Sequence, residues 1–197
     1  MPIVTKLTSQ KKGEFINLYV DEEFLCGLSL NQVASWRLRK GQELSVEQLQ
    51  QLRAEAETSK AYNAAIRYLA LRIRSTGEMR DYLKRKGFDA SIDDIVQRLT
   101  EEGYLNDEDF ARRWADMRRD MLKSPFAIES ELLRKGISKD TIRAVVSDQG
   151  VDSTIQELIA KKNRHRKYDR EQMMRYLVGR GFTYSQVKPH LDSERSS

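Results

Sequence analysis

Residues 82–88 read YLKRKGF, residues 131–137 read ELLRKGI and residues 176–182 read YLVGRGF. In each stretch a leucine lies four residues before a glycine, a basic residue comes directly before that glycine and an apolar residue directly after it. The three glycines are 49 and then 45 residues apart. A repeat of about 45 residues is typical of stacked helical arrays. We therefore expect three copies of one helical unit.

Three helices are expected in the first copy, and the first of them carries Tyr62, Ala65, Ile66, Leu69 and Ile73 at helical spacing. Ser75-x-x-Glu78 is a capping-box pattern, in which a hydroxyl accepts a hydrogen bond from the first turn of a helix. Gly87 is expected to end this helix, because glycine readily takes the left-handed conformation that terminates helices. Ser91 is then expected to cap a further helix that ends at Gly103.

The second and third copies carry equivalent signals. Ser124, which precedes a proline, predicts a helix start in the second copy, and Gly136 predicts the end of that helix. Asp169, three residues before a glutamine, predicts the corresponding start in the third copy. The last helix, over about 183–191, is short and contains a proline, as expected at the end of an array.

The first thirty residues have the pattern of β structure. Apolar residues predominate or alternate in residues 16–20 and 24–28, which is typical of strands. Together with residues 3–9, these segments predict a small three-stranded antiparallel sheet. Polar residues at 11–13 and 21–23 are expected to form its turns.

Two helices are expected to follow the sheet. Ser29 is placed to cap a short helix that reaches about Trp36. Ser45-x-x-Gln48 is a second capping box, and its helix is expected to run to about Ser59 and to cover the sheet.

The sequence thus predicts a mainly α fold. Tandem three-helix repeats in an elongated, curved array follow a small N-terminal β-hairpin or three-stranded sheet with one or two helices. The expected boundaries are 1–59 for the β-rich module, 60–104, 105–150 and 151–192 for the repeats, and 193–197 for a frayed tail.

Composition limits the classes of function. The chain of 197 residues is 33% charged and 39% hydrophobic, with a mean hydropathy of −0.68. It has no apolar run long enough to span a membrane and no apolar signal core at its start, so a cytoplasmic protein is expected. We also expect it to be a monomer. Cys26 is the one cysteine, which fits a reducing compartment, and its strand-like setting predicts a small buried hydrophobe rather than a nucleophile.

The sequence offers no catalytic constellation. It contains no cysteine pair and no glycine-rich phosphate loop, and its two histidines, His165 and His190, have no metal-ligand neighbours at useful spacing. Three acidic residues at 107–109 follow Asn106 at an expected helix start, where carboxylates complement the helix dipole. We therefore expect no enzyme activity, no metal and no cofactor.

Basic clusters are the remaining candidates for function. The net charge is +5 overall and is concentrated in residues 150–197, where it is +4, which favours a polyanionic partner. A cluster at a helix end is also explained by the helix dipole or by solvation, but recurrence in each copy favours a binding face. Aromatic residues do not alternate with these cations along the chain, as a stacking platform for single strands would require. The candidates are Arg72, Arg74, Lys84, Arg85, Lys86, Arg112, Arg113, Arg118, Arg119, Arg134, Lys135, Lys161, Lys162, Arg164 and Arg166.

Four motifs together resemble the bacterial RecX regulatory family over about residues 60–191. They are Arg72-Ile73-Arg74-Ser75-x-x-Glu78, Leu83-x-x-Lys86-Gly87, Gly103-Tyr104-Leu105-Asn106-Asp107-x-x-Phe110-Ala111 and Glu131-Leu132-x-x-Lys135-Gly136-Ile137. The N-terminal β segment resembles an extension found in some members of that family.

The resemblance implies a regulator of the RecA recombinase rather than an enzyme. It implies tandem three-helix repeats that bind the RecA filament on single-stranded DNA, along the groove of the filament. Such binding restrains filament growth, strand exchange, ATPase and coprotease activity in recombination and the SOS response. Direct contact with single- or double-stranded DNA is compatible with it.

Two other functions stay open. The first is a helical-repeat scaffold for another protein partner, which composition does not distinguish from a RecA regulator. The second is a helix-turn-helix-type DNA-binding protein. The acidic residues Asp93, Asp94 and Asp140 argue against this second function, because they lie at helix N-termini where a phosphate would approach.

Overall fold

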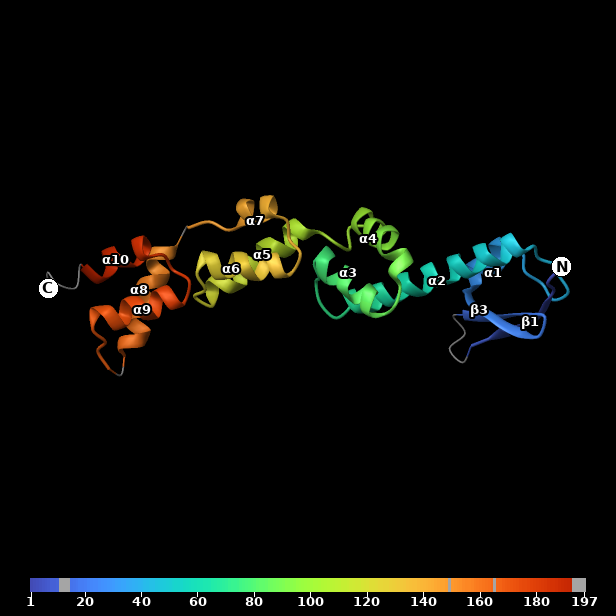
Figure 1. Cartoon of the computed structure of the whole chain (residues 1–197), viewed down its shortest axis with the longest axis horizontal. Coiled ribbons are helices and arrows are strands. Elements are labelled where there is room, and N and C mark those ends of the chain that lie inside the picture. The colour runs from blue at the N-terminus through green and yellow to red at the C-terminus, as the bar shows by residue number, and fades with distance from the viewer. Residues whose placement is uncertain (11–14, 149, 165, 193–197) are drawn as a thin grey trace. The chain divides into compact units, whose positions relative to one another are not determined.

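The computed structural model describes residues 1–10, 15–148, 150–164 and 166–192 (Figure 1). The chain divides into two compact units: unit 1 holds Met1–Arg72 and Met79–Glu102, and unit 2 holds Ile73–Glu78 and the residues from Gly103 onward. The elements are β1 (Val4–Ser9), β2 (Phe15–Val20), β3 (Glu23–Ser29), α1 (Leu30–Ser35), α2 (Val46–Leu69), α3 (Thr76–Arg85), the 3₁₀ turn η1 (Asp89–Ser91), α4 (Ile92–Glu101), α5 (Asp107–Asp120), α6 (Pro125–Arg134), α7 (Lys139–Val145), α8 (Val151–Asn163), α9 (Arg170–Gly179) and α10 (Tyr184–Asp192).

Unit 1 begins with the predicted three-stranded antiparallel sheet, in the order β1-β2-β3. Leu18 and Leu28 lie on the covered face and are fully buried, together with Leu52 of α2. Asp21 and Glu22 form the turn between β2 and β3 with positive φ angles. The turn predicted at residues 11–13 lies outside the described residues. The alternation of apolar side chains therefore identified both the strands and the face that α2 covers.

The helices after the sheet begin where the sequence predicted. Ser29 and Ser45 both form complete capping boxes, with Gln32 and Gln48 respectively. The predicted end of the second helix near Ser59 is wrong, because α2 continues without a break to Leu69. No glycine or proline interrupts α2, so the backbone has no local reason to leave the helix there.

The remainder of unit 1 contains most of α3 and all of α4. Met79 and Leu83 of α3 are fully buried, as is Leu99 of α4. Ser91 does not act as the predicted side-chain cap of α4. Its buried hydroxyl instead lies 3.2 Å from that of Thr58 on α2, because η1 turns it inward.

Unit 2 contains two three-helix groups. The first, α5 to α7, has a core that includes Phe110, Ile128 and Leu132. The second, α8 to α10, packs around residues such as Ile155 and Leu177, and its helices lie together in Figure 1. These groups and the N-terminal sheet confirm the predicted fold class of tandem three-helix repeats after a small sheet.

The repeated glycine stretches form one backbone motif three times. Gly87, Gly136 and Gly181 have φ angles of 77°, 77° and 90°. In each copy the amide of the following apolar residue donates to the carbonyl of the leucine four residues before the glycine, and the glycine amide donates to the next carbonyl. This is the Schellman motif, so the prediction that these glycines end helices is confirmed.

Candidate functional site

The basic cluster at the end of α3 is exposed. Lys84, Arg85 and Lys86 form no ion pair with any residue in the described part of the chain. The ammonium of Lys86 lies 5.9 Å from the centre of the Tyr82 ring, which is a weak cation–π contact at the surface. The charges of Lys84 and Arg85 are therefore available to a partner.

The arginines in the first half of α5 are also exposed but have local partners. Arg112 pairs with Glu108 at 2.7 Å and Arg113 pairs with Asp109 at 2.9 Å, each one helical turn away. Such exposed pairs contribute little to stability. A partner that binds these arginines has to displace a carboxylate first.

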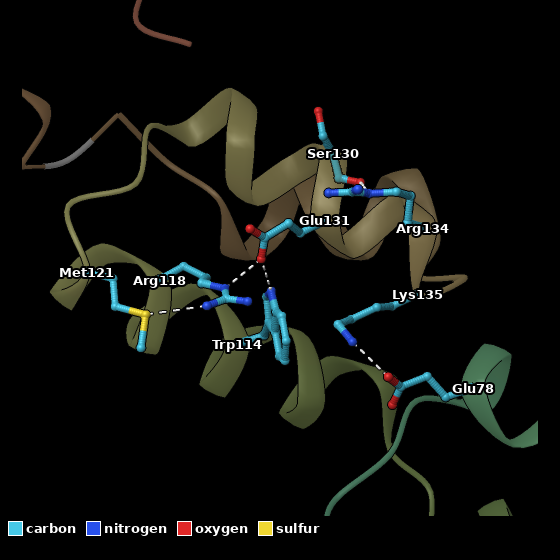
Figure 2. A network of polar contacts seen from close by, with 8 residues as sticks. All are labelled: Glu78, Trp114, Arg118, Met121, Ser130, Glu131, Arg134 and Lys135. Carbon is cyan, nitrogen blue, oxygen red and sulfur yellow. Dashed lines mark hydrogen bonds and ion pairs between the residues drawn. The ribbon is translucent and has the colours of Figure 1, made fainter. Parts of the chain in front are cut away.

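Arg118, further along α5, belongs to a buried network around Trp114 (Figure 2). The guanidinium of Arg118 and the indole N–H of Trp114 both donate to one oxygen of Glu131, at 2.5 and 2.9 Å. Burial alone would raise the pKa of the Glu131 carboxyl, but the hydrogen bonds from Arg118 and Trp114 outweigh it and hold this pKa below its usual range. Arg118 therefore serves the packing of α5 on α6.

Lys135 lies on the other side of the same indole ring. Figure 2 shows the Trp114 side chain between those of Arg118 and Lys135, whose charged groups are 4.4 and 4.0 Å from the ring centre. The ammonium of Lys135 pairs with Glu78 at 2.7 Å, and both side chains are less than one fifth exposed. By contrast, Arg134 is exposed and, among the described residues, donates only to the carbonyl of Ser130. Two adjacent basic residues thus have different environments.

The Lys135 backbone receives a second contact from the start of α3. The Ser75 hydroxyl donates to the Lys135 carbonyl at 2.6 Å and accepts from the amide of Glu78 at 3.1 Å. Gly77 permits this approach, because a side chain there would collide with the Lys135 carbonyl oxygen. The amide and hydroxyl of Thr76 both donate to Asp107 of α5. We call this arrangement the Ser75 junction.

The same arrangement recurs between α6 and α9. The Ser124 hydroxyl caps α6 by accepting from the Ala127 amide at 3.2 Å and donates to the Arg180 carbonyl at 2.9 Å. Ser75 and Ser124 are both fully buried. We call this second arrangement the Ser124 junction. In the third copy the equivalent residue is Asp169, an exposed cap that accepts from the Gln172 amide and, when ionised, has no proton to donate.

These junctions were not predicted from the sequence, although the sequence contains a pattern that marks their positions. Ser75, Ser124 and Asp169 each lie twelve residues before the glycine of their copy. The two serines were interpreted as helix caps alone. A hydroxyl both accepts and donates, so a serine that recurs at one offset is also able to join two helices.

The basic residues near the end of α8 lie among tyrosines. The Lys162 ammonium is 4.7 Å from the ring centre of Tyr168 and 4.9 Å from that of Tyr176. Arg166 is exposed and lies 5.6 Å from the Tyr168 ring. Folding therefore brings these cations beside aromatic rings, although the two kinds of residue do not alternate along the chain.

The remaining candidates lie in different settings. Lys161 pairs with Glu157 at 2.8 Å, and Arg164 is exposed beyond the end of α8. Arg119 is half-buried, where it pairs with Asp116 and donates to the Val145 carbonyl. Arg72 is exposed and Arg74 half-buried in the segment between α2 and α3. The structure thus separates exposed cations without an ion pair from cations held by other residues of the chain.

Metal-binding clusters and membrane-spanning helices are both absent from the described residues. These residues contain no group of three or more histidine, cysteine, aspartate or glutamate side chains arranged to hold a metal ion. No helix among them is long and apolar enough to cross a lipid bilayer.

Comparison with known proteins gives consistent results. Three family models match: the regulatory protein RecX N-terminal domain over residues 2–45, the first RecX three-helix domain over 61–99 and the second over 106–146. The regulatory protein RecX of Bacillus velezensis is 30% identical over 98% of this chain and 77% of its own length, and that of Bacillus subtilis is 28% identical over the same shares.

Solved structures show the same fold. A crystal structure of a regulatory protein RecX superposes with a TM-score of 0.72 over 96% of this chain and 100% of its own, at 21% identity. The RecX of Lactobacillus salivarius gives a TM-score of 0.58 over 69% of this chain and 97% of its own, at 25% identity. The chain belongs to the RecX family of regulatory proteins.

Proposed function

We propose that this protein is a non-enzymatic regulator that binds RecA filaments on single-stranded DNA along the filament groove. Its binding restrains filament growth, ATP hydrolysis, strand exchange and coprotease activity in recombination and the SOS response. Membership of the RecX family is the observation that carries this proposal. The protein acts in the cytoplasm as a monomer, and contact with single- or double-stranded DNA contributes to filament binding.

Exposed cations that form no ion pair with a described residue are the strongest candidates for the interface. They include Lys84 and Arg85 on α3, Arg134 on α6 and Arg164 and Arg166 after α8. Such residues gain an ion pair on binding without losing one, whereas Arg112, Arg113 and Lys161 first have to leave a carboxylate. We assign these three, together with Arg72, Arg74 and Lys162, a supporting role in the same interface.

Each predicted segment is assigned its own part in this function. Residues 60–104, 105–150 and 151–192 supply the filament-binding repeats, and residues 1–59 form a separate module. Lys135 at the Ser75 junction and Arg118 between α5 and α6 serve the packing of the chain rather than contact the filament, because each is held by a carboxylate and the Trp114 ring.

The direct test is RecA ATP hydrolysis on single-stranded DNA, with this protein added below the RecA concentration. A fall in rate at substoichiometric ratios supports filament binding. Unchanged hydrolysis, with intact filaments in electron micrographs, favours a scaffold for another protein. Binding to free duplex that competes with RecA for DNA favours a DNA-binding protein.

Charge reversal tests the interface itself. Lys84→Glu combined with Arg85→Glu is expected to weaken filament binding about tenfold or more, because two attractive charges become repulsive. The double variant Arg112→Glu and Arg113→Glu is the matched control with paired arginines, and a smaller effect is expected. Equal effects would remove the distinction between paired and unpaired cations.

A further inference from the structure

The two edges of the N-terminal sheet differ. The outer edge of β1 is covered, because the backbone of Val4 exchanges hydrogen bonds with Gly41 and Gln42, and Leu44 donates to Pro2. The outer edge of β3 is different. Within the described residues, the backbone of Phe24–Gly27 forms no hydrogen bond with any segment other than β2. An open edge is a template for another extended chain.

A groove follows this open edge. Four consecutive residues of β3, Phe24–Gly27, line a hollow of about 340 Å³ with Arg53 and Lys60 of α2. The register of β3 against β2 shifts at Leu25, which has no partner residue on β2, so the alternation of side chains is interrupted in this stretch and the hollow contacts all four residues. An adjoining hollow of about 220 Å³ is lined by Phe24, Gly27, Lys60 and Arg67. We call the two together the β3 groove.

The helical wall of the β3 groove is basic. Arg53, Lys60 and Arg67 are seven residues apart on α2, so they share one side of the helix at intervals of about 10 Å. All three are exposed, and none forms an ion pair with a described residue. Glu57 is the carboxylate that lines the same groove, between Arg53 and Lys60.

Apolar surface lies beside these charges. Phe24 is 57% exposed at the strand, and Ala56 and Phe88 line the first hollow. Gly27 leaves the strand edge without a side chain at the point where both hollows meet. The groove therefore offers backbone hydrogen-bonding groups, apolar contacts and spaced positive charges together.

We propose that the β3 groove binds an extended acidic segment of a partner protein, which adds a strand to the edge of β3. In strand addition, main-chain hydrogen bonds supply affinity and side-chain pockets supply specificity. Carboxylates of the segment pair with Arg53, Lys60 and Arg67. A single nucleic-acid strand fits less well, because Glu57 would lie beside its continuous row of phosphates. This site is separate from the repeat surface proposed for the filament.

The test uses the whole chain and labelled peptides of about ten residues, the length of a long strand. The first peptide alternates glutamate with valine, the second replaces every glutamate by glutamine, and the third keeps the glutamates but is N-methylated at alternate residues. Fluorescence anisotropy measures binding. The first peptide is expected to bind at least about tenfold more tightly than the other two, because one lacks charge and the other lacks strand hydrogen bonds.

Variants locate the site. The triple variant Arg53→Glu, Lys60→Glu and Arg67→Glu is expected to lose binding of the acidic peptide, with circular dichroism confirming that it folds. Lys40→Glu, an exposed cation that lines neither hollow, is the control and is expected to bind normally.

Four results would overturn the proposal. They are no binding of the acidic peptide, equal binding of the N-methylated peptide, unchanged binding by the triple variant, and tighter binding of a labelled oligothymidylate that the triple variant loses. The last result would assign the groove to single-stranded nucleic acid.

Discussion

The hydroxyl of Ser75 donates a 2.6 Å hydrogen bond to the carbonyl of Lys135, a residue 60 positions further along the chain. Ser124 forms the equivalent bond with Arg180, 56 positions away. In both cases the cap of one helix meets the last residue before the glycine that ends another. One side chain therefore supplies a hydrogen-bond partner to both a helix start and a helix end.

Ser75→Ala is expected to lower the free energy of unfolding more than an ordinary cap substitution. It removes a helix cap, which costs about 1 kcal/mol, and takes the hydroxyl partner from the partly buried Lys135 carbonyl, which costs about 1 kcal/mol more. Ser138→Ala is the matched control, since the exposed Ser138 caps α7 by accepting from the Thr141 amide and bonds to no other helix. Urea denaturation compares them, and equal losses would show that the hydrogen bond to Lys135 adds no stability.

Alanine substitutions at Gly136 and Gly87 distinguish two costs. One is the strain of a left-handed residue, which both positions share, and the other is the collision of two backbones, which only Gly136 has. Both have a φ of 77°, so alanine at either position is strained by about 1–2 kcal/mol. At Gly87 an added methyl group meets nothing within 4 Å, whereas at Gly136 it lies 2.9 Å from the Cα of Gly77. Gly136→Ala is therefore expected to cost about 1–3 kcal/mol more than Gly87→Ala, since the two backbones have to move apart.

Thermal or urea unfolding of the two glycine variants checks this prediction. Similar losses would mean that the backbones at Gly77 and Gly136 adjust without strain. Gly77→Ala offers a second measurement of the same contact, because its methyl group would approach the Lys135 carbonyl directly.

Local signals in the sequence predicted much of the fold. The serine caps at Ser29, Ser45 and Ser124, the glycine stops and the alternation in β2 and β3 all depend on residues within a few positions of each other. Each motif satisfies its own backbone groups, so it is recognisable without knowledge of the rest of the chain. The exceptions were Ser91 and the helix break at Ser59, where tertiary packing and helix continuity decide.

The candidate site was less predictable for a physical reason. Arg134 and Lys135 are both basic and are adjacent in the sequence, but only Lys135 forms an ion pair with Glu78, which lies 57 residues away. Likewise, Lys162 reaches Tyr168 and Tyr176 only because α8 and α9 pack together. For Lys135 and Lys162 the partners come from distant contacts, and a periodic motif carries no information about such contacts.

The Glu131 network predicts a loss of stability in acid. The pKa of Glu131 is lowered in the folded state, so its ionised form stabilises the fold. This contribution is fully present above the usual glutamate pKa of about 4.3 and is lost as the pH falls through the lower value of the folded state. Glu131→Gln is expected to be less stable at neutral pH and to lose less stability on acidification.

The measurement is urea denaturation at neutral pH and at several values below the usual glutamate pKa. Glu129→Gln, an exposed position on the same helix, is the control and is expected to follow the unmodified protein. If Glu131→Gln and Glu129→Gln have the same dependence on pH, the hydrogen bonds from Arg118 and Trp114 do not contribute to acid sensitivity.

The thiol of Cys26 is expected to react slowly with alkylating reagents. Burial raises its pKa to about 11, although the nearby charge of Arg53 opposes this shift. Since the thiolate is the reactive form, alkylation at mildly alkaline pH is expected to be about a hundredfold slower in the folded protein than in urea, where the pKa returns to about 8.5. The chain has a single cysteine, so mass spectrometry reads the rate directly. A rapid reaction in the folded protein would show that the thiol is both accessible and ionised.

Substitutions at Arg134 and Lys135 are expected to have different effects, one on filament binding and the other on the stability of the fold. Arg134→Glu changes an exposed side chain and is expected to leave the melting temperature unchanged while it weakens filament binding. Lys135→Glu places a carboxylate beside Glu78 in a setting less than one fifth exposed, and it removes a cation from the Trp114 ring. It is expected to destabilise the fold by about 3 kcal/mol or more, because a buried charge loses its partner and meets a like charge.

Combining Lys135→Glu with Glu78→Lys restores opposite charges at the Ser75 junction and is expected to recover part of the lost stability, which a double-mutant cycle measures. Filament binding by this reversed pair then decides the role of Lys135. Recovered binding means that the lysine acts by holding the repeats in register, whereas binding that stays lost in a stable protein places Lys135 in the interface beside Arg134.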